Sequence, residues 1–205
     1  MKPLVLALVL LVGIAHSQIP KPCFTPARWE AKASRFDHNH GKMEHYRFVY
    51  DAVMQRKVIF DNILLHPGRK RYEYLILNDV NVMYRIDRQS KKCEKMFPGP
   101  WRPYGIPPMA TFKTEYEIGY PGEDFTAQEW IFKEKDSDAV LWRGVYGLKY
   151  CFPVVETFFN PNNRSESNTI NFYDIASGIP DPTVFLPPSE CRDAVLVHEK
   201  PPAYF

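Results

Sequence analysis

The sequence of 205 residues has no strong imbalance of charge. It contains 26 Lys and Arg residues against 24 Asp and Glu residues, a formal net charge of +2. Proteins that bind nucleic acid usually concentrate basic residues on one face, so this near balance argues against a nucleic-acid partner. The basic run at residues 69–71 flanks a strand pattern, where such charges discourage pairing between the sheets of different molecules. Peripheral contact with anionic lipid headgroups is the alternative for this run.

Motifs of common enzyme classes are also missing. The chain has no Gly-x-Ser-x-Gly elbow and no glycine-rich phosphate loop, and His198-Glu199 is followed by Lys-Pro-Pro instead of completing a zinc-protease motif. Two carboxylate pairs, Glu115 with Glu117 and Glu123 with Asp124, fit ordinary strand and turn positions better than an acid–base pair. We therefore expect no enzymatic activity and no catalytic residues.

Metal-binding patterns are equally scarce. His38, His40 and His45 have no carboxylate or cysteine at ligand spacing, which favours solvated loop histidines. The run 136–138 (Asp-Ser-Asp) resembles the opening of a calcium loop but lacks the later glycine and the bidentate glutamate, so it reads as a plain turn. We expect no metal site and no cofactor from the residues alone.

Only one long hydrophobic run occurs, at the beginning of the chain. Lys2 precedes the apolar residues 4–14, and Ala15 and Ser17 are small residues at −3 and −1 of a cut before Gln18. The run is shorter than the roughly 20 apolar residues that a membrane-spanning helix needs. We expect a signal peptide at residues 1–17 and one secreted domain at 18–205, with a membrane anchor as the alternative.

The four cysteines are widely spaced. Cys23, Cys93, Cys151 and Cys191 show none of the short spacing of metal sites, and behind a signal peptide an even set predicts two disulfides. Three pairings are possible, and spacing does not choose among them. Asn163 begins an Asn-Arg-Ser sequon in a polar stretch, so we expect an N-glycan there.

Alternating apolar and polar residues predict strands along most of the chain. The stretch 138–159 has the most aromatic and β-branched residues and reads as two strands meeting near Cys151. Asn78-Asp79 separates two alternating runs, which predicts a hairpin with a two-residue turn. The proline-rich run 97–108 fits a connection packed over the sheet, or else a domain linker. We expect nine or ten antiparallel strands in one mainly β domain with few short helices.

Aromatic residues are unusually abundant, with 14 Phe, 12 Tyr and 4 Trp. Side chains of this size must pack between two sheets, line a cavity or be buried in a dimer. We take a cavity as the working hypothesis and expect tyrosine hydroxyls and Trp130 to meet a ligand headgroup at its mouth. The candidate wall residues share one predicted strand face: Tyr46, Phe48, Tyr50, Tyr72, Tyr74, Val82, Tyr84, Trp130, Phe132, Trp142 and Phe158.

Several local patterns resemble the ependymin-related proteins, a family of secreted glycoproteins. They are the early Pro-Cys-x-x-Pro at 22–26, the strand 46–51, the region 87–93, Pro-Gly-Glu-Asp-Phe at 121–125 with Trp130, and Cys-x-Pro-Val at 151–154. The order and spacing of these patterns carry the resemblance, which covers nearly all of the chain after residue 17.

The resemblance implies two stacked, curved antiparallel sheets, a half-barrel or sandwich like bacterial lipoprotein carriers, around a deep hydrophobic pocket. It also implies a homodimer in the extracellular space or lysosome that binds fatty acids, gangliosides or other lipids. It further implies the bridges Cys23–Cys151 and Cys93–Cys191. Some relatives carry six cysteines, so this chain lacks one bridge. Calcium binding is attributed to some relatives, but the sequence has no matching ligand loop.

The combined interpretation is a non-catalytic carrier of apolar molecules. Two alternatives come from other classes. A lipid or glycan hydrolase would need a polar cluster at the pocket floor with a nucleophile or a carboxylate pair. An adhesion or signalling glycoprotein would need an exposed patch for a partner and no pocket.

Overall fold

The computed structural model describes residues 20–61, 72–135, 139–161 and 167–198. The predicted signal peptide, the basic run 69–71, the acidic run 136–138 and the sequon at Asn163 lie outside the described residues. Within the described ranges, no helix is both long and apolar enough to cross a membrane.

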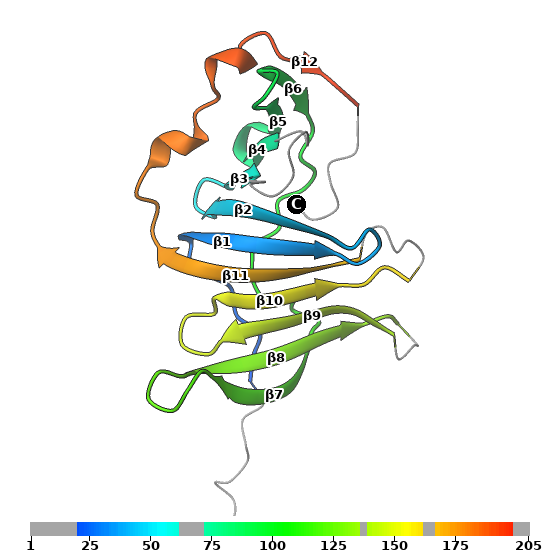
Figure 1. Cartoon of the computed structure of the whole chain (residues 1–205), viewed down its shortest axis with the longest axis vertical. Coiled ribbons are helices and arrows are strands. Elements are labelled where there is room, and N and C mark those ends of the chain that lie inside the picture. The colour runs from blue at the N-terminus through cyan, green and yellow to red at the C-terminus, as the bar shows by residue number, and fades with distance from the viewer. Residues whose placement is uncertain (1–19, 62–71, 136–138, 162–166, 199–205) are drawn as a thin grey trace, which may run out of the picture.

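Twelve strands make up nearly all of the described regular structure (Figure 1). They are β1 (Arg28–Asp37), β2 (Lys42–Asp51), β3 (Arg56–Asp61), β4 (Tyr72–Leu77), β5 (Val82–Asp87), β6 (Lys92–Met96), β7 (Thr111–Ile118), β8 (Phe125–Lys133), β9 (Val140–Gly147), β10 (Pro153–Phe158), β11 (Asn168–Ser177) and β12 (Val195–Leu196). Short 3₁₀ turns are η1 (Asn78–Val80), η3 (Pro182–Phe185) and η4 (Ser189–Cys191). The expectation of a mainly β chain with few short helices is confirmed.

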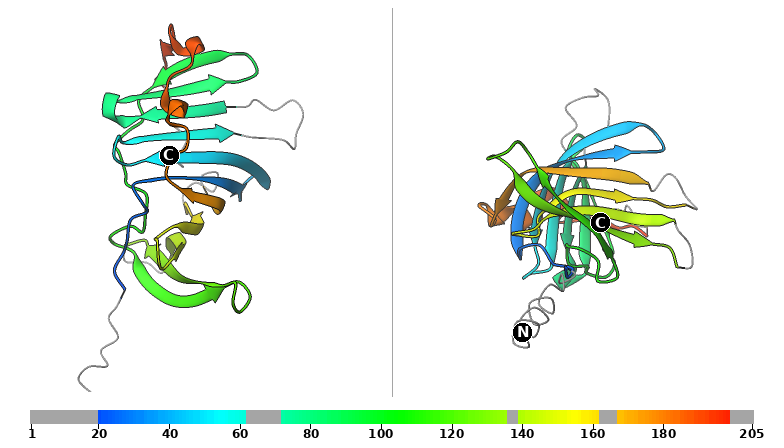
Figure 2. Two further views of the ribbon diagram at one scale, coloured as in Figure 1. Left: turned by 90° about the vertical axis from the view of Figure 1, so that its left-hand side faces the viewer. Right: turned by 90° about the horizontal axis from the view of Figure 1, so that it is seen from below.

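Hydrogen bonds join the strands into one curved sheet, in the order β12-β6-β5-β4-β3-β2-β1-β11-β10-β9-β8-β7 (Figure 2). The short β12 pairs in parallel with β6, and the other described pairs are antiparallel. Most neighbours follow one another along the chain, while β1 pairs with the distant β11. The predicted curved antiparallel architecture is present, but its two halves form one continuous sheet through β1 and β11.

The two faces of the sheet are covered by different segments. The face that carries Phe48 and Tyr50 packs against residues 97–110, which connect β6 to β7, and we call it the connection face. The opposite face carries Val49 and packs against residues 179–194, and we call it the tail face. In Figure 1 the connection passes behind the sheet, and the tail follows its left side. The proline-rich run is therefore the predicted connection over the sheet and not a linker between domains.

The hairpin between β4 and β5 differs from its prediction. Residues 78–80 form η1 and Asn81 adopts a left-handed conformation (φ 53°), so the connection is longer than the predicted two-residue turn. Leu75 consequently pairs with Tyr84, and Leu77 with Val82. Because cross-strand partners share a face, Val82 and Tyr84 lie on the tail face, opposite to Tyr74. Their assignment to the same face as Tyr72 and Tyr74 was wrong.

Both disulfides attach a covering segment to the sheet. Cys23–Cys151 joins the N-terminal segment to the turn between β9 and β10, and Cys93–Cys191 joins η4 to β6. These are the pairs that the family resemblance implies. Each bridge closes a long stretch of chain, with sequence separations of 128 and 98 residues.

Asp51 anchors the end of β2 through a buried carboxylate. It accepts hydrogen bonds from Arg28 (3.2 Å), Arg56 (3.0 Å) and the backbone N–H groups of Val53 and Met54. Burial alone would raise its pKa, but these donors outweigh burial and lower the pKa. The ionised group therefore stabilises the fold fully above its unfolded pKa of about 3.9, and this stabilisation is lost as the pH falls through the lower folded pKa.

Candidate functional site

A cavity of about 300 Å³ lies between the connection and the strands beneath it. Its walls come from β2, β3, β9, β10 and β11, and its roof comes from residues 102–107. The residues that line it are Phe48, Lys57, Arg102, Pro103, Tyr104, Gly105, Pro107, Trp142, Glu156, Phe158 and Ile170. Most of these groups are apolar, as in small-molecule pockets, where a few polar groups fix the orientation of the ligand.

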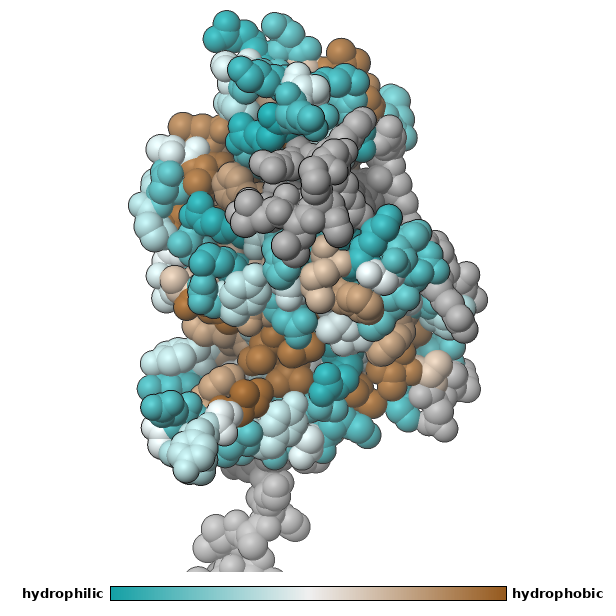
Figure 3. Space-filling view, viewed as in Figure 1, coloured by the Kyte–Doolittle hydropathy of each residue, from teal (hydrophilic) through white to brown (hydrophobic). Residues whose placement is uncertain are grey.

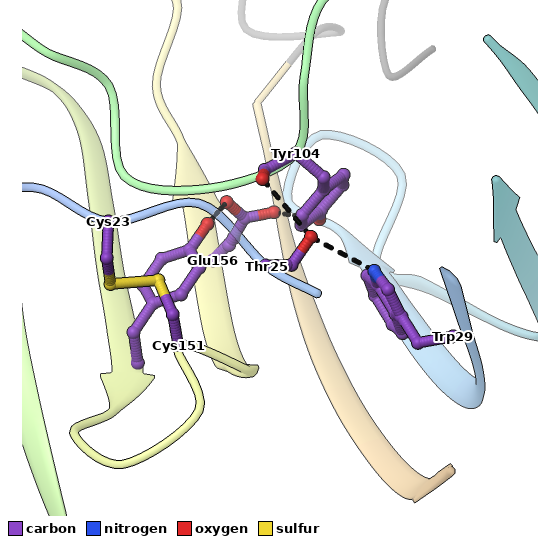
Figure 4. The surroundings of a disulfide bond; sticks show 7 residues. Cys23, Thr25, Trp29, Tyr104, Cys151 and Glu156 are labelled. Carbon is purple, nitrogen blue, oxygen red and sulfur yellow. Dashed lines mark hydrogen bonds between the residues drawn. A yellow bond between two sulfur atoms is a disulfide. The ribbon is translucent and has the colours of Figure 1, made fainter. Parts of the chain in front are cut away.

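The roof is fastened to the N-terminal segment by backbone pairing. Ile106 donates to the carbonyl of Cys23 (2.9 Å), and Thr25 donates to the carbonyl of Tyr104 (3.0 Å). Between them, a Cβ on Gly105 would lie 2.6 Å from the carbonyl oxygen of Cys23, so only glycine fits this approach. The Cys23–Cys151 bridge then attaches the pair of segments to the sheet (Figure 4).

Trp29 supports the roof from the sheet side. Its side chain is fully buried, and its indole N–H donates to the hydroxyl of Thr25 (3.0 Å; Figure 4). Its ring lies 5.6 Å from the ring of Tyr104, which lines the cavity, and 5.1 Å from that of Phe48. Tyr50 adds a hydroxyl that accepts from the backbone N–H of Tyr104 (2.9 Å). The aromatic cluster thus fixes the height of the roof above the sheet.

Glu156 is a buried carboxylate in the lining of the cavity. Tyr146 donates a hydrogen bond of 2.5 Å to one of its oxygens, and Tyr104 donates to the other. Burial raises the pKa of Glu156 despite the hydrogen bonds from the two tyrosines and from Trp142, and despite the attraction of Lys57. Burial and the adjacent carboxylate also raise the pKa of both tyrosines, so both remain neutral donors.

Lys57 brings a second buried charge to the cavity. The residue is 8 % exposed, and its ammonium lies 4.8 Å from the centre of the Trp101 ring. Burial lowers its pKa to about 8, although the attraction of Glu156 acts in the opposite direction. At neutral pH the side chain is therefore mostly a cation, stabilised by the indole face and by the carboxylate.

Three of the eleven predicted wall residues line this cavity, and eight do not. Phe48, Trp142 and Phe158 line it. Tyr46, Tyr50 and Tyr74 belong to the aromatic cluster around Trp29, and Phe132 packs in the cluster beside Trp142. Tyr72 contacts the ring of Tyr74. Val82 and Tyr84 lie on the tail face, as described above.

The structure places Trp130 away from the cavity mouth, where we expected it to meet a headgroup. It is 1 % exposed and packs edge-on against Phe112 in the cluster that includes Ile106 and Cys151. Its indole N–H has no hydrogen-bond partner among the described residues. Trp130 is therefore a core residue, and its replacement by Asp would disturb folding before it disturbed a ligand.

Sequence reasoning missed the polar groups of the site: Lys57, Arg102, Tyr104 and Glu156. The available signal was the single carboxylate of Glu156 within the apolar strand 153–158, because an acidic residue in such a strand is seldom buried without a partner. Lys57 gave a weaker signal, because it follows Arg56 in the same strand. The sequence alone does not show which of these two cations is buried.

The histidines predicted to be solvated contact polar groups at exposed positions. His38 contacts the Thr169 hydroxyl at 2.8 Å, and His40 lies 2.8 Å from the Asp37 carboxylate. Among the described residues, no group of three His, Cys, Asp or Glu side chains is arranged to hold a metal ion.

A second, larger hollow of about 630 Å³ lies beside the turn between β9 and β10. It is lined mainly by apolar side chains, of which Phe125, Leu148 and Tyr150 are between 45 and 59 % exposed. Figure 3 shows hydrophobic residues gathered over the part of the molecule that contains β9, β10 and β11. This hollow has no buried charge in its lining, so it offers apolar contact without the polar groups that orient a ligand.

Together these features define an antiparallel β protein, cross-linked by two disulfides, in which a connection closes an apolar cavity that contains a buried carboxylate and a buried ammonium. Sequence comparison agrees with this description and also identifies a family. A family model described as Ependymin matches residues 66–191. The chain belongs to the ependymin family, as the resemblance in its motifs predicted.

Individual relatives extend the match over most of the chain. Mammalian ependymin-related protein 1 of Rattus norvegicus is 36 % identical over 186 residues, which cover 89 % of this chain and 82 % of the relative. A solved structure of an uncharacterized conserved protein from Thermus thermophilus aligns with a TM-score of 0.56 at 9 % identity, covering 94 % of this chain and 99 % of that one. This likeness shows a shared fold.

A putative outer membrane lipoprotein-sorting protein domain from Vibrio parahaemolyticus aligns with a TM-score of 0.37 at 9 % identity, over 78 % of this chain and 89 % of that one.

Proposed function

We propose that this protein is a non-catalytic glycoprotein, secreted or lysosomal, that binds fatty acids, gangliosides or other lipids in the cavity under the connection. The observation that carries the proposal is an apolar cavity roofed by a segment that a disulfide fastens to the sheet. Each methylene group that leaves water on entering such a site contributes about 0.8 kcal/mol. The volume of about 300 Å³ is at the lower end of the range for small-molecule pockets.

The cavity is better suited to binding than to hydrolysis. Its described lining contains no Ser, Cys or His, and Glu156 is its one carboxylate. Both oxygens of Glu156 already accept hydrogen bonds from tyrosine hydroxyls, so the group has little capacity to activate water. A hydrolase would require a nucleophile or a second carboxylate at this position.

The two disulfides support an oxidising compartment, such as the extracellular space, because disulfides seldom persist in the cytosol. Within this proposal the signal peptide at 1–17, the glycan at Asn163 and a homodimer remain expectations from sequence. Calcium binding is likewise an expectation from family resemblance alone.

Phe158 and its neighbour Phe159 provide a matched test of the cavity. Phe158 lines the cavity, whereas Phe159 does not and is 43 % exposed. Replacing Phe158 with Glu is expected to weaken binding of a fluorescent fatty acid by at least about tenfold, because the carboxylate replaces apolar surface that the acyl chain would contact and adds a negative charge beside the fatty-acid carboxylate. Phe159→Glu is expected to leave the titration unchanged.

Far-UV circular dichroism and thermal unfolding would establish that both variants fold. If Phe158→Glu does not fold, Phe158→Trp provides the same test by filling part of the cavity. A folded variant of Phe158 that binds the probe as tightly as the wild type would show that this cavity is not the ligand site.

A further inference from the structure

Lys57 is a buried cation for which the described part of the chain provides no hydrogen-bond acceptor. It pairs in register with Tyr50 and Ile76, both buried, and is itself 8 % exposed. Among the described residues, its ammonium makes the ring contact with Trp101 and is attracted to Glu156, but no hydrogen bond or ion pair to it is present. An ammonium has three donors, and buried charges are normally paired. The side chain therefore lines the cavity with unused hydrogen-bonding capacity.

The charges around the cavity favour one added negative charge. Lys57 and Arg102 are the cations of the lining, and Glu156 is its anion. Tyr104 and Tyr146 already satisfy the oxygens of Glu156, so this carboxylate does not need the ammonium as a hydrogen-bond donor. The lining then has one positive charge in excess, which a singly charged anionic group would neutralise.

We propose that Lys57 selects ligands with an anionic oxygen group, a carboxylate or phosphate, at the end of an apolar chain, and that this group binds inside the cavity instead of at its mouth. The inference rests on the proposed function, since it requires the apolar chain to enter the same cavity. A charge-assisted hydrogen bond from the ammonium would compensate for the dehydration of the anionic group. Arg102, which is exposed on the roof, adds a second cation to the lining.

The arrangement also explains why a lysine, and not an apolar residue, occupies this position. Val58 and Ile59 beside it on β3 are buried apolar residues, so the strand could be completed without a charge. A buried cation here loses hydration, and the indole face of Trp101 compensates for only part of that cost. An anionic ligand supplies the missing partner.

The decisive experiment compares ligands that differ only in the headgroup. Dodecanoate, dodecyl phosphate and the neutral dodecanol would each displace a neutral fluorescent probe, N-phenyl-1-naphthylamine, from the delipidated full chain. The wild type is expected to bind one or both anions about tenfold more tightly than dodecanol, and the two anionic arms show whether carboxylate or phosphate is preferred. Equal binding of all three ligands would overturn the inference.

Variants of Lys57 separate headgroup recognition from a structural role. Lys57→Met retains the length of the side chain without its charge, and is expected to abolish the preference for anions, because it weakens binding of the anions more than binding of dodecanol. Lys57→Arg should retain the preference, and the exposed Lys113→Met serves as a charge-matched control. A preference that survives in Lys57→Met, or equal loss of all ligands in a folded variant, would overturn the role of Lys57.

Failure of the proposed function would look different. In that case the probe itself would not bind to the wild type, and no ligand would give a displacement signal. If Lys57→Met does not fold, Lys57→Gln provides the same comparison, and the wild-type preference for anions over dodecanol still tests the inference.

Discussion

Replacing Trp29 with Ala is expected to lower the free energy of unfolding by about 3–5 kcal/mol, as for other buried Trp and Phe truncations. Trp29 is fully buried at the centre of the connection face. Its ring contacts five aromatic rings at centroid distances between 5.1 and 6.0 Å, those of Phe48, Tyr50, Tyr104, Phe152 and Phe172. The vacancy cannot collapse easily, because several of these side chains are held by strand register on β2 and β11.

Urea denaturation followed by intrinsic fluorescence would measure the effect, with Tyr120→Ala as the control. Tyr120 is 78 % exposed, so its truncation should change the free energy by no more than about 0.5 kcal/mol. Trp29→Ala should also weaken ligand binding, since the ring of Trp29 lies against Tyr104 in the roof. A loss of stability below about 1 kcal/mol would show that the aromatic cluster repacks and does not fix the roof.

Removal of either disulfide is expected to cost roughly 2–5 kcal/mol, and the two double-alanine variants should lose similar amounts. In the chain-entropy model the cost depends on the logarithm of the loop length, and separations of 128 and 98 residues differ little on that scale. Chemical denaturation of the Cys23→Ala/Cys151→Ala and Cys93→Ala/Cys191→Ala proteins would measure both values.

Ligand binding should distinguish the two variants even though stability does not. Cys23–Cys151 fastens the segments that form the roof of the cavity, whereas Cys93–Cys191 fastens η4 on the tail face. Only loss of the first bridge should weaken binding of a fluorescent fatty acid to the folded protein. The account of the roof would be contradicted if the Cys93→Ala/Cys191→Ala protein lost more affinity than its counterpart.

Local sequence patterns were sufficient to predict most of the strands and the course of the connection. Alternation in 44–50 and 72–76 is a local property of each strand, and prolines between 97 and 108 exclude a central strand regardless of tertiary context. The direction in which each side chain of a strand points is harder to predict from the local sequence. Val82 and Tyr84 were assigned to the wrong face because both faces of β4 carry large apolar residues; the four-residue connection 78–81 moves their cross-strand partners by two positions, and an even shift does not change the face.

The candidate site was predictable only in part, because it depends on pairs that are distant in sequence. Phe48, Trp142 and Phe158 meet since β1 pairs with β11 and brings the two halves of the sheet together. Lys57 and Glu156 face the same cavity although about half of the chain separates them. The roof segment covers both side chains, and the Cys23–Cys151 bridge helps to hold that segment on the sheet. The spacing of the cysteines alone did not reveal this pairing.

Native mass spectrometry of the protein purified from a eukaryotic secretion host tests the central claim most directly. The claim is that the cavity under the connection holds one apolar ligand per chain. The account predicts co-purifying lipid at near one molecule per chain, identified after extraction as an acyl compound with an anionic headgroup. A protein that carries no ligand and takes up no added fatty acid would contradict the account, and the aromatic residues would then serve only a packed core.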